Sequence, residues 1–285
     1  ASTTGAKWWW GCSRHAMDFL KAIILAVIEG ATEFLPISST GHLIIADEYI
    51  QLAADQDFVT TFLVVIQLPA ILAVVLYFWA ALWPFGREKD TAAIFGLWTK
   101  VVVAFLPAAV LGVLFADYIE ARLFNSITVS VALILGGVVL IVIEGRGYRP
   151  RLASVHDIRW TTGLLIGCFQ CLAMIPGTSR AAATIIGAML LGTSRPAAAE
   201  FSFFLAVPTM TGAAAYTILD NGLVFTTRQW CLVAVGSVVS FLVAYAVVAF
   251  LMRFIQRHTF TVFGYYRIAL GLLVLAILVA LPALL

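Results

Sequence analysis

Long apolar runs alternate with short polar segments along most of the chain. Six runs are uninterrupted, and each is close to or above the roughly 20 residues that an α-helix needs to cross a hydrocarbon layer of about 30 Å. They lie at about 58–83, 92–115, 127–144, 197–219, 229–252 and 264–285. This pattern predicts six transmembrane helices.

Two further apolar stretches, about 17–50 and 160–192, are each interrupted near the centre by a polar segment that contains proline and glycine. The interruptions are residues 36–42 (PISSTGH) and residues 176–180 (PGTSR). Backbone that leaves the helix at membrane depth must be buried in protein or line a wet cavity, because lipid cannot hydrogen-bond the freed groups. We therefore expect two re-entrant helical hairpins whose tips point into the protein.

The composition of the 285-residue chain supports a membrane location. Hydrophobic residues make up 62% and charged residues 11%, whereas roughly a quarter of a soluble domain is charged. An aromatic content of 13% with so little charge is the opposite of a disordered composition. The net charge of +2 offers no electrostatic footprint for nucleic acid, so we expect no such partner. The predicted fold class is an all-α polytopic membrane protein.

Residues 1–16 differ from the rest of the chain. They lack the apolar core of a secretory signal and contain three consecutive tryptophans, Trp8, Trp9 and Trp10. We treat them as an N-terminal extension, whether native or added, and leave them out of the fold prediction. Residues 17–285 are then expected to form a single membrane domain.

The segment Cys168-Phe169-Gln170-Cys171 has the C-x-x-C spacing of redox and metal sites. No second cysteine pair lies near it in sequence, and residues i and i+3 of a helix are simply neighbours. We favour small, packable side chains over redox chemistry at this position.

The distribution of charged residues tests this order of membrane crossings and hairpins. If both hairpins return to the side from which they enter, nine basic residues fall on one side of the membrane: Arg87, Lys89, Arg146, Arg149, Arg151, Arg159, Arg195, Arg253 and Arg257. The opposite side receives two, Arg122 and Arg228. The positive-inside rule makes the first side cytoplasmic and places both termini outside. The first hairpin then enters from outside and the second from the cytoplasm, so their tips can meet near the middle of the membrane.

The two halves of the chain resemble each other. A shift of 140 residues places residues 36–40 on 176–180, and a shift of 139 places 62–69 on 201–208. Three crossings separate the two hairpins, and an odd number inverts the second copy. We expect inverted-topology repeats at about 17–144 and 160–285, a pattern in which matching broken segments mark a binding site.

Two carboxylates lie in the first broken stretch. Glu29 and Glu33 are four residues apart and share one helical face. Like charges at this spacing in apolar surroundings need a cation or a proton, and a divalent metal is the natural partner. The alternative is a structural pair that Arg180 neutralises or that stays protonated. Because ionisable residues inside membrane segments are usually functional, we favour a metal site.

The second tip supplies the opposite charge. Arg180 is the only arginine deep in either hairpin, and its planar guanidinium suits bidentate binding of phosphate oxygens. A helix restarts near Gly41 and another near Ala181, so two helix N-termini would offer unpaired N–H groups to an anion. Four hydroxyl residues beside them are candidate N-caps: Ser38, Ser39, Thr178 and Ser179. For Ser38, Thr178 and Ser179, either capping or ligand positioning, or else a catalytic role, fits the pattern.

His42 follows Ser39 by three residues, close to one helical turn, so the imidazole is within reach of that hydroxyl. We expect an acid–base role for His42. Gln67, in an apolar span, either points into the same cavity or makes a helix–helix hydrogen bond. Lys100 and Arg267 lie near span ends, where snorkelling to the membrane surface explains their charges.

These groups together describe a membrane-embedded cavity with acids for a metal, a guanidinium, two helix N-termini, a hydroxyl and an imidazole. The chemistry that they fit is phosphoryl transfer or phosphate-ester hydrolysis, in which positioning and charge neutralisation supply most of the rate. The apolar part of the substrate would lie in lipid.

Residues 29–42 (EGATEFLPISSTGH) resemble the first signature of the undecaprenyl-diphosphate phosphatases of the bacitracin-resistance type, and residues 176–184 (PGTSRAAAT) resemble the second. The similarity extends from about Met17 to the C-terminus. It implies a bacterial inner-membrane enzyme that removes one phosphate from undecaprenyl diphosphate and returns the lipid carrier to cell-wall synthesis. It also implies an active site open toward the outer face, dependence on a divalent metal such as Mg²⁺ or Ca²⁺, and a homodimer.

The resemblance also assigns roles to residues of this chain. It implies an acidic motif at Glu29 and Glu33, a nucleophile at Ser39 beside Ser38, proton transfer assisted by His42, and substrate binding by Arg180. Attack by metal-activated water would use the same residues.

Two positions depart from the family pattern. Ala181 stands where the family usually has serine, so that hydroxyl is not essential here. Pro69 stands where the family usually has glycine, which leaves the local helix geometry open. Neither position carries an assigned chemical role.

Two other functions fit parts of the pattern. Inverted repeats around a midplane site also occur in transporters, so a polyprenyl-phosphate transporter or flippase that uses the same site is the alternative. A relative of the type-2 phosphatidic acid phosphatases is disfavoured because the H-x-x-x-D motif is missing. No Asp stands four residues after His15, His42, His156 or His258.

Overall fold

The computed structural model describes residues 4–52, 56–85, 90–147 and 149–284. Within these ranges the regular structure is helical, and the one β-type contact is an isolated bridge between Leu152 and Thr193. The α-helices are α1 (Thr4–Thr32), α2 (Ser39–Tyr49), α3 (Gln56–Val65), α4 (Gln67–Tyr77), α5 (Trp79–Leu82), α6 (Thr91–Leu123), α7 (Ser126–Gly145), α8 (Trp160–Gln170), α9 (Arg180–Leu190), α10 (Arg195–Asn221), α11 (Thr227–Phe254) and α12 (Thr261–Leu284). Two short 3₁₀ segments are η1 (Val155–Asp157) and η2 (Cys171–Met174).

Six segments of the described chain are long and apolar enough to cross a membrane, which confirms the prediction of six spans. They are Asp57–Tyr77, Thr91–Ala116, Ser126–Gly145, Arg195–Asn221, Thr227–Phe254 and Thr261–Leu278. The first consists of α3 and α4, which are separated at Ile66. Pro69 explains the break, because it has no N–H to donate to the carbonyl of Val65. The chain is therefore a multi-pass helical membrane protein.

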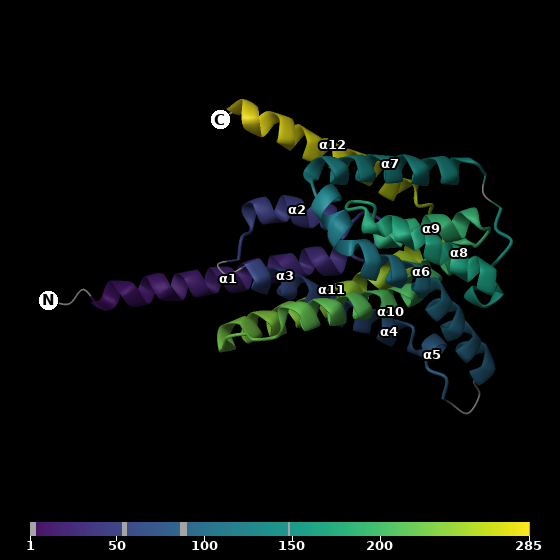
Figure 1. Ribbon diagram of the computed structural model, residues 1–285, viewed down its shortest axis with the longest axis horizontal. Coiled ribbons are helices and arrows are strands. Elements are labelled where there is room, and N and C mark those ends of the chain that lie inside the picture. Colours follow the sequence, from purple (N-terminus) through teal and green to yellow (C-terminus); the bar gives the residue numbers. More distant parts are fainter. Residues whose placement is uncertain (1–3, 53–55, 86–89, 148, 285) are drawn as a thin grey trace.

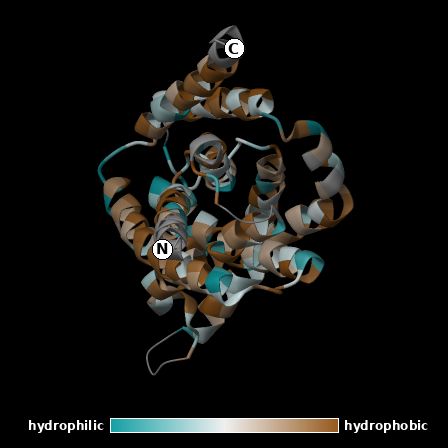
Figure 2. Ribbon diagram, turned by 90° about the vertical axis from the view of Figure 1, so that its left-hand side faces the viewer, coloured by the Kyte–Doolittle hydropathy of each residue, from teal (hydrophilic) through white to brown (hydrophobic). Residues whose placement is uncertain are grey.

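Apolar side chains also cover the outside of the bundle. Figure 2 shows hydrophobic residues on the outward sides of the helices as well as between them. Val113 is 80% exposed and Leu114 65% exposed, although both are strongly hydrophobic. A soluble monomer rarely presents so much contiguous apolar surface, whereas a bilayer covers it.

Both broken stretches form helix–turn–helix units, α1 with α2 and α8 with α9. Figure 1 shows α1 and α2 reaching the centre of the molecule from the left-hand end and α8 and α9 from the right-hand end. α1 begins at Thr4, so its backbone includes most of the segment treated as an extension. The helix breaks overlap the predicted ones, although α1 already ends at Thr32 and α2 begins at Ser39 rather than near Gly41. The re-entrant position of the tips within a membrane stays a prediction.

The two turns share one unusual backbone feature. Ser38 has φ of 74° and Ser179 has φ of 68°, and they are the only non-glycine residues in the described ranges with positive φ. Each immediately precedes the second helix of its unit. The structural equivalence therefore has an offset of 141 residues, one more than the shift of 140 read from the sequence, because the turn aligns on the N-cap serine and not on the proline. The inverted repeat itself stays a prediction that this geometry fits.

The two ends of the bundle are held by different groups. At one end the Glu144 carboxylate at the end of α7 pairs with Arg195 at the start of α10 and accepts the amide hydrogen of Phe260, just before α12. At the other end Asp18 of α1 pairs with Arg228 of α11. The turns assigned to each side of the membrane thus gather at the expected ends. Which end faces the cytoplasm stays a prediction.

Close helix crossings bind each helix–turn–helix unit to the other half of the chain. A Cβ on Gly30 of α1 would lie 2.7 Å from the carbonyl oxygen of Ser240 in α11. A Cβ on Gly167 of α8 would lie 2.0 Å from the carbonyl oxygen of Ala104 in α6. Only glycine permits either approach, so the first arm of each unit packs against a long helix of the other half.

Candidate active site where the two tips meet

The tips of the two helix–turn–helix units are joined by an ion pair. Nη2 of Arg180, the first residue of α9, lies 3.1 Å from Oε1 of Glu33, which follows the end of α1. The side chains are only 10% and 11% exposed, so the contact lies in a largely water-excluded place. The acid and the cation that the sequence places in separate hairpins therefore share one site.

The second oxygen of Glu33 holds a hydroxyl. The Oγ–H of Ser39, the first residue of α2, donates to Oε2 of Glu33 at 2.8 Å. One carboxylate thus connects a candidate nucleophile to a guanidinium. A carboxylate that accepts this hydrogen bond is placed to remove the proton when the oxygen attacks.

The serines at the two turns cap the helices that follow. Oγ of Ser38 accepts the amide hydrogen of Gly41 at 3.4 Å, and Oγ of Ser179 accepts that of Ala182 at 3.3 Å. Capping, one of the alternatives for these hydroxyl groups, is therefore present at Ser38 and Ser179. Because Ser39 and Arg180 begin these helices and both bind Glu33, the first turns of α2 and α9 lie beside the same carboxylate. Thr178, directly before the second cap, is partly exposed.

His42 does not bind Ser39, contrary to the expectation from their spacing. Its Nδ1 donates to the carbonyl oxygen of Ser38 at 2.7 Å, so Nε2 is the unprotonated nitrogen and accepts the hydroxyl hydrogen of Tyr266 at 2.7 Å. The two rings also stack, with centroids 5.6 Å apart. The physical reason is the N-terminal turn of α2, where His42 folds back onto its own turn while Ser39 faces Glu33. No feature of the sequence connects Tyr266 with this site.

Arg180 is held by more than its acid partner. Nη1 donates to the carbonyl oxygen of Ser202 at 3.1 Å, and the guanidinium carbon lies 5.7 Å from the centre of the Phe34 ring. Its Nε is buried without a hydrogen-bond partner in the described part of the chain. The guanidinium is therefore fixed in place and still has an unused donor.

Glu29 is completely buried, and neither of its carboxylate oxygens has a hydrogen-bond partner among the described residues. Glu33 and Gln67 are polar side chains close enough to act on its charge. Gln67 begins α4 directly after the break at Ile66, which brings it to the same site. A buried carboxylate in this state requires a cation or a proton.

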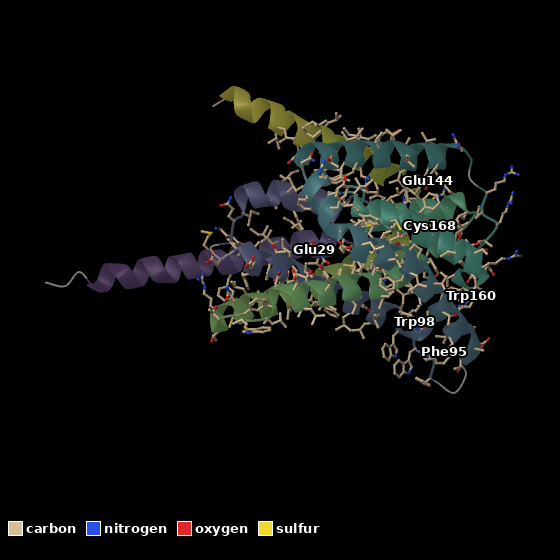
Figure 3. All side chains as sticks on the ribbon, viewed as in Figure 1. Glu29, Phe95, Trp98, Glu144, Trp160 and Cys168 are labelled. Carbon is tan, nitrogen blue, oxygen red and sulfur yellow. The ribbon has the colours of Figure 1, made fainter. Side chains whose placement is uncertain are left out.

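The donor set suits a hard divalent cation. Carboxylate and amide oxygens are the ligands that Mg²⁺ and Ca²⁺ prefer. Across the described residues no three side chains of His, Cys, Asp or Glu are grouped closely enough to hold a metal by themselves. A cation held by Glu29 and Glu33 would thus need further oxygen ligands from water or from a bound phosphate. Figure 3 places Glu29 at the inner part of α1, whereas Glu144 and Trp160 lie toward the right-hand end.

Arg267 does not reach toward the membrane surface, so the expectation of snorkelling is wrong. Its side chain is 0% exposed, and its guanidinium donates to backbone carbonyls, among them those of Pro36 and Gly177 in the two tips. Arg267 is the seventh residue of α12, and the packing of α12 against α7 encloses it. Lys100 makes a hydrogen bond outside the two tips, from Nζ to the carbonyl oxygen of His156 at 3.0 Å.

The C-x-x-C pair lies away from the tips. Cys168 and Cys171 are free thiols that line an apolar groove of about 430 Å³ together with Leu106, Pro107, Val110, Leu111 and Leu164. The thiol of Cys171 donates to the carbonyl oxygen of Gly167 at 3.4 Å. These surroundings fit packing side chains and provide no polar partner for redox chemistry.

Comparisons with known proteins agree with these features. Residues 22–273 match the family described as bacitracin resistance protein BacA. The chain is 50% identical over 266 residues to undecaprenyl-diphosphatase 1 of Clostridioides difficile (strain 630), which covers 91% of this chain and 96% of that protein. It is 50% identical over 272 residues to the undecaprenyl-diphosphatase of Enterococcus faecalis, with 92% and 99% covered. Because the family match spans most of the chain and the relatives align almost from end to end, this chain belongs to the bacitracin resistance protein BacA family.

Proposed function

We propose that the chain hydrolyses undecaprenyl diphosphate to undecaprenyl phosphate and inorganic phosphate, which recycles the lipid carrier of cell-wall synthesis. The observation that carries this proposal is the double contact of Glu33, whose carboxylate accepts the Ser39 hydroxyl at 2.8 Å and pairs with Arg180 at 3.1 Å. A nucleophile, a base and a phosphate-binding cation are thereby within reach of one phosphorus atom. The relatives named undecaprenyl-diphosphatase support the choice of substrate.

The reaction proceeds in two steps. Oγ of Ser39 attacks the terminal phosphorus while Glu33 takes the hydroxyl proton, a new Oγ–P bond forms, and the bridging P–O bond breaks. Undecaprenyl phosphate leaves. Water then attacks the phosphorus and the Oγ–P bond breaks, Glu33 returns its proton to Oγ of Ser39, and inorganic phosphate is released. Arg180 stabilises the charge on the phosphoryl oxygens, and the N-termini of α2 and α9 add backbone N–H donors.

The remaining polar groups bind or orient the diphosphate. Ser38 and Ser179 shape the two turns, and Thr178 and Gln67 provide further hydrogen-bonding groups beside them. His42, held by Tyr266 and by its own turn, assists proton transfer at the outer part of the site. The prenyl chain stays in lipid, where the apolar outer surface of the bundle accommodates it.

Glu29 and Glu33 hold a divalent cation, Mg²⁺ or Ca²⁺, in this proposal. The buried and unpartnered oxygens of Glu29 support it. When bound, the cation neutralises charge on the diphosphate and lowers the cost of placing two carboxylates together. Chelation should abolish phosphate release, and addition of Mg²⁺ or Ca²⁺ to the chelated protein should restore it. Full activity in the chelated protein would contradict the metal assignment.

The orientation and assembly are part of the proposal. The excess of basic residues in the turns near Glu144 supports a cytoplasmic location for that end, with both termini and the opening of the site facing outward from the plasma membrane. The protein forms a homodimer, as the family resemblance implies. Labelling of single cysteines in intact cells and the mass of the protein in detergent test these two statements separately.

Phosphate release by the purified protein tests the function directly. The protein in detergent micelles should release phosphate from undecaprenyl diphosphate, and Glu33→Gln should lose most of this activity. The variant should still fold, with a lower unfolding temperature because Arg180 loses its counter-ion. Wild-type rates in Glu33→Gln would contradict the site. Transfer of lipid between leaflets of a vesicle without phosphate release would favour the flippase alternative.

A further inference from the structure

Arg267 is a charged residue that the proposed reaction does not use. Its side chain is completely buried in the middle of the bundle. In the part of the chain that the structure describes, its guanidinium takes part in no ion pair. Burial of a charge without a counter-ion costs several kcal/mol, so its retention calls for a specific use of its donors.

The guanidinium connects three segments that are far apart in sequence. Nη1 donates to the carbonyl oxygen of Pro36 at 3.3 Å, and Nη2 donates to that of Gly177 at 3.1 Å. Nη2 also donates to Ala132 at 3.1 Å and Nε to Leu133 at 3.4 Å, both in α7. One side chain of α12 thus fastens both tips to each other and to a transmembrane helix.

Its two contacts in the tips are structurally equivalent. Pro36 lies two residues before Ser38, and Gly177 lies two residues before Ser179. Arg267 therefore binds the same carbonyl of each turn, just before the positive-φ serine that starts the second helix. A shift of either turn would move the next residues, Ser39 or Arg180, relative to Glu33.

The neighbouring helix leaves space for this guanidinium. A Cβ on Gly136 of α7 would lie 2.4 Å from Nη2 of Arg267, so the guanidinium would have to move away from its present position. The second tip is equally close to α7, because a Cβ on Gly177 would lie 2.5 Å from the carbonyl oxygen of Val129. The glycine at position 136 is thus required by the position of the Arg267 side chain.

We propose that Arg267 is a positioning residue for phosphate release, which holds the two tips at the spacing in which Ser39 and Arg180 act on one phosphate. This inference rests on the proposed function. Arg267 does not touch the substrate in this role, so its loss should leave binding intact and misalign the attack. We expect kcat to fall on the order of 100-fold, as for a displacement of about 1 Å, while KM changes less than about 3-fold.

Three variants and one control test the inference by kcat and KM for undecaprenyl diphosphate, with thermal unfolding measured in the same micelles. Arg267→Gln removes the charge, and Arg267→Lys keeps it but cannot span both carbonyls. Gly136→Ala keeps the arginine but displaces its guanidinium. It does not weaken α7, because alanine has a higher helix propensity than glycine. The control, Arg257→Gln, changes an exposed arginine beyond α11 and should leave both constants unchanged.

We expect a lower kcat with a preserved KM in all three variants, including Gly136→Ala. Wild-type kcat in both Arg267→Lys and Gly136→Ala would overturn the inference, and these two decide the matter if Arg267→Gln fails to fold. A raised KM with unchanged kcat would also overturn it, because that result assigns Arg267 to substrate binding. Failure of the unsubstituted protein to release phosphate would instead contradict the proposed function.

Discussion

In the first tip the residue after the positive-φ serine is Ser39, and in the second tip it is Arg180. The turns themselves are alike: Ser38 and Ser179 have φ of 74° and 68°, and each caps the amide three residues on. The offset of 141 residues also pairs Glu29 with Gln170 and His42 with Ala183. One backbone turn is thus used twice with different side chains.

This difference explains how the site acquires its charge pattern. Two identical tips that meet head-on would bring like charges together, which is unfavourable in a site of low exposure. Here the first tip contributes carboxylates and a hydroxyl, and the second contributes a guanidinium. Gln170, in place of an acid, accepts a hydrogen bond from the Thr209 hydroxyl at 3.3 Å and carries no charge. The pairing of unlike tips is what makes a phosphate site possible.

Loss of the Ser39 hydroxyl in the first tip should give the largest effect. Ser39→Ala should lower the rate of phosphate release on the order of 1,000-fold or more, because the proposed nucleophile is lost. Ser38→Ala should keep more than about a tenth of the activity, since it removes only a cap of about 1 kcal/mol. A rate within about 10-fold of wild type in Ser39→Ala would assign the attack to water.

Replacement of the cation in the second tip should come next. Arg180→Lys keeps the charge but loses the planar fork that binds Glu33 and Ser202 at once, so activity should fall about 100-fold. Steady-state phosphate release measures this. Arg253→Lys, at an exposed position near the end of α11, serves as the matched control. Equal activity of Arg180→Lys and the control would show that charge alone is sufficient.

Glu29→Gln gives the first tip the amide that Gln170 has at the equivalent position of the second tip. This substitution should lower activity about 10- to 100-fold through weaker metal binding. The protein should unfold at the same or a higher temperature, because a buried carboxylate without a hydrogen-bond partner is removed. A titration of Glu29→Gln with Mg²⁺, followed by phosphate release, gives the shift in metal dependence. An unchanged titration curve would place the cation elsewhere.

Loss of the Tyr266 hydroxyl, which binds His42, should have a smaller effect. Tyr266→Phe removes the hydrogen bond to Nε2 at 2.7 Å and keeps the stacked ring, so activity should fall about 3- to 10-fold. The rate of phosphate release as a function of pH measures this, and the profile should change shape because Nε2 of His42 loses its hydrogen-bond donor. An identical profile in Tyr266→Phe would mean that His42 is structural.

Glycine at the two positive-φ positions should have the smallest effect. Ser38→Gly and Ser179→Gly relieve backbone strain of about 1–2 kcal/mol and lose a cap that glycine replaces with a deficit of only a few tenths. The greater entropy of unfolded glycine offsets part of the gain. The free energy of unfolding should therefore stay within about 1 kcal/mol of wild type. Thermal unfolding of both variants in micelles measures it, and opposite changes at the two tips would break the equivalence of the turns.

Local features of the chain determined much of this protein. Apolar runs of the length of a bilayer gave the six spans, because helix length and hydrophobicity are properties of contiguous sequence. Proline, glycine and serine gave the positions of the two breaks for the same reason. Glu33, Ser39 and Arg180 were predicted as site residues because charged and hydroxyl groups are conspicuous in apolar surroundings.

Only the tertiary structure decided which of these groups meet. Glu33 and Arg180 are 147 residues apart, His42 and Tyr266 are 224 apart, and Pro36 and Arg267 are 231 apart. Which face of a transmembrane helix turns toward the interior depends on close packing at glycines such as Gly136, and periodicity within an almost uniformly apolar span does not reveal it. Arg267 therefore looked like a surface charge in the sequence, although in the folded protein it lies between the two tips.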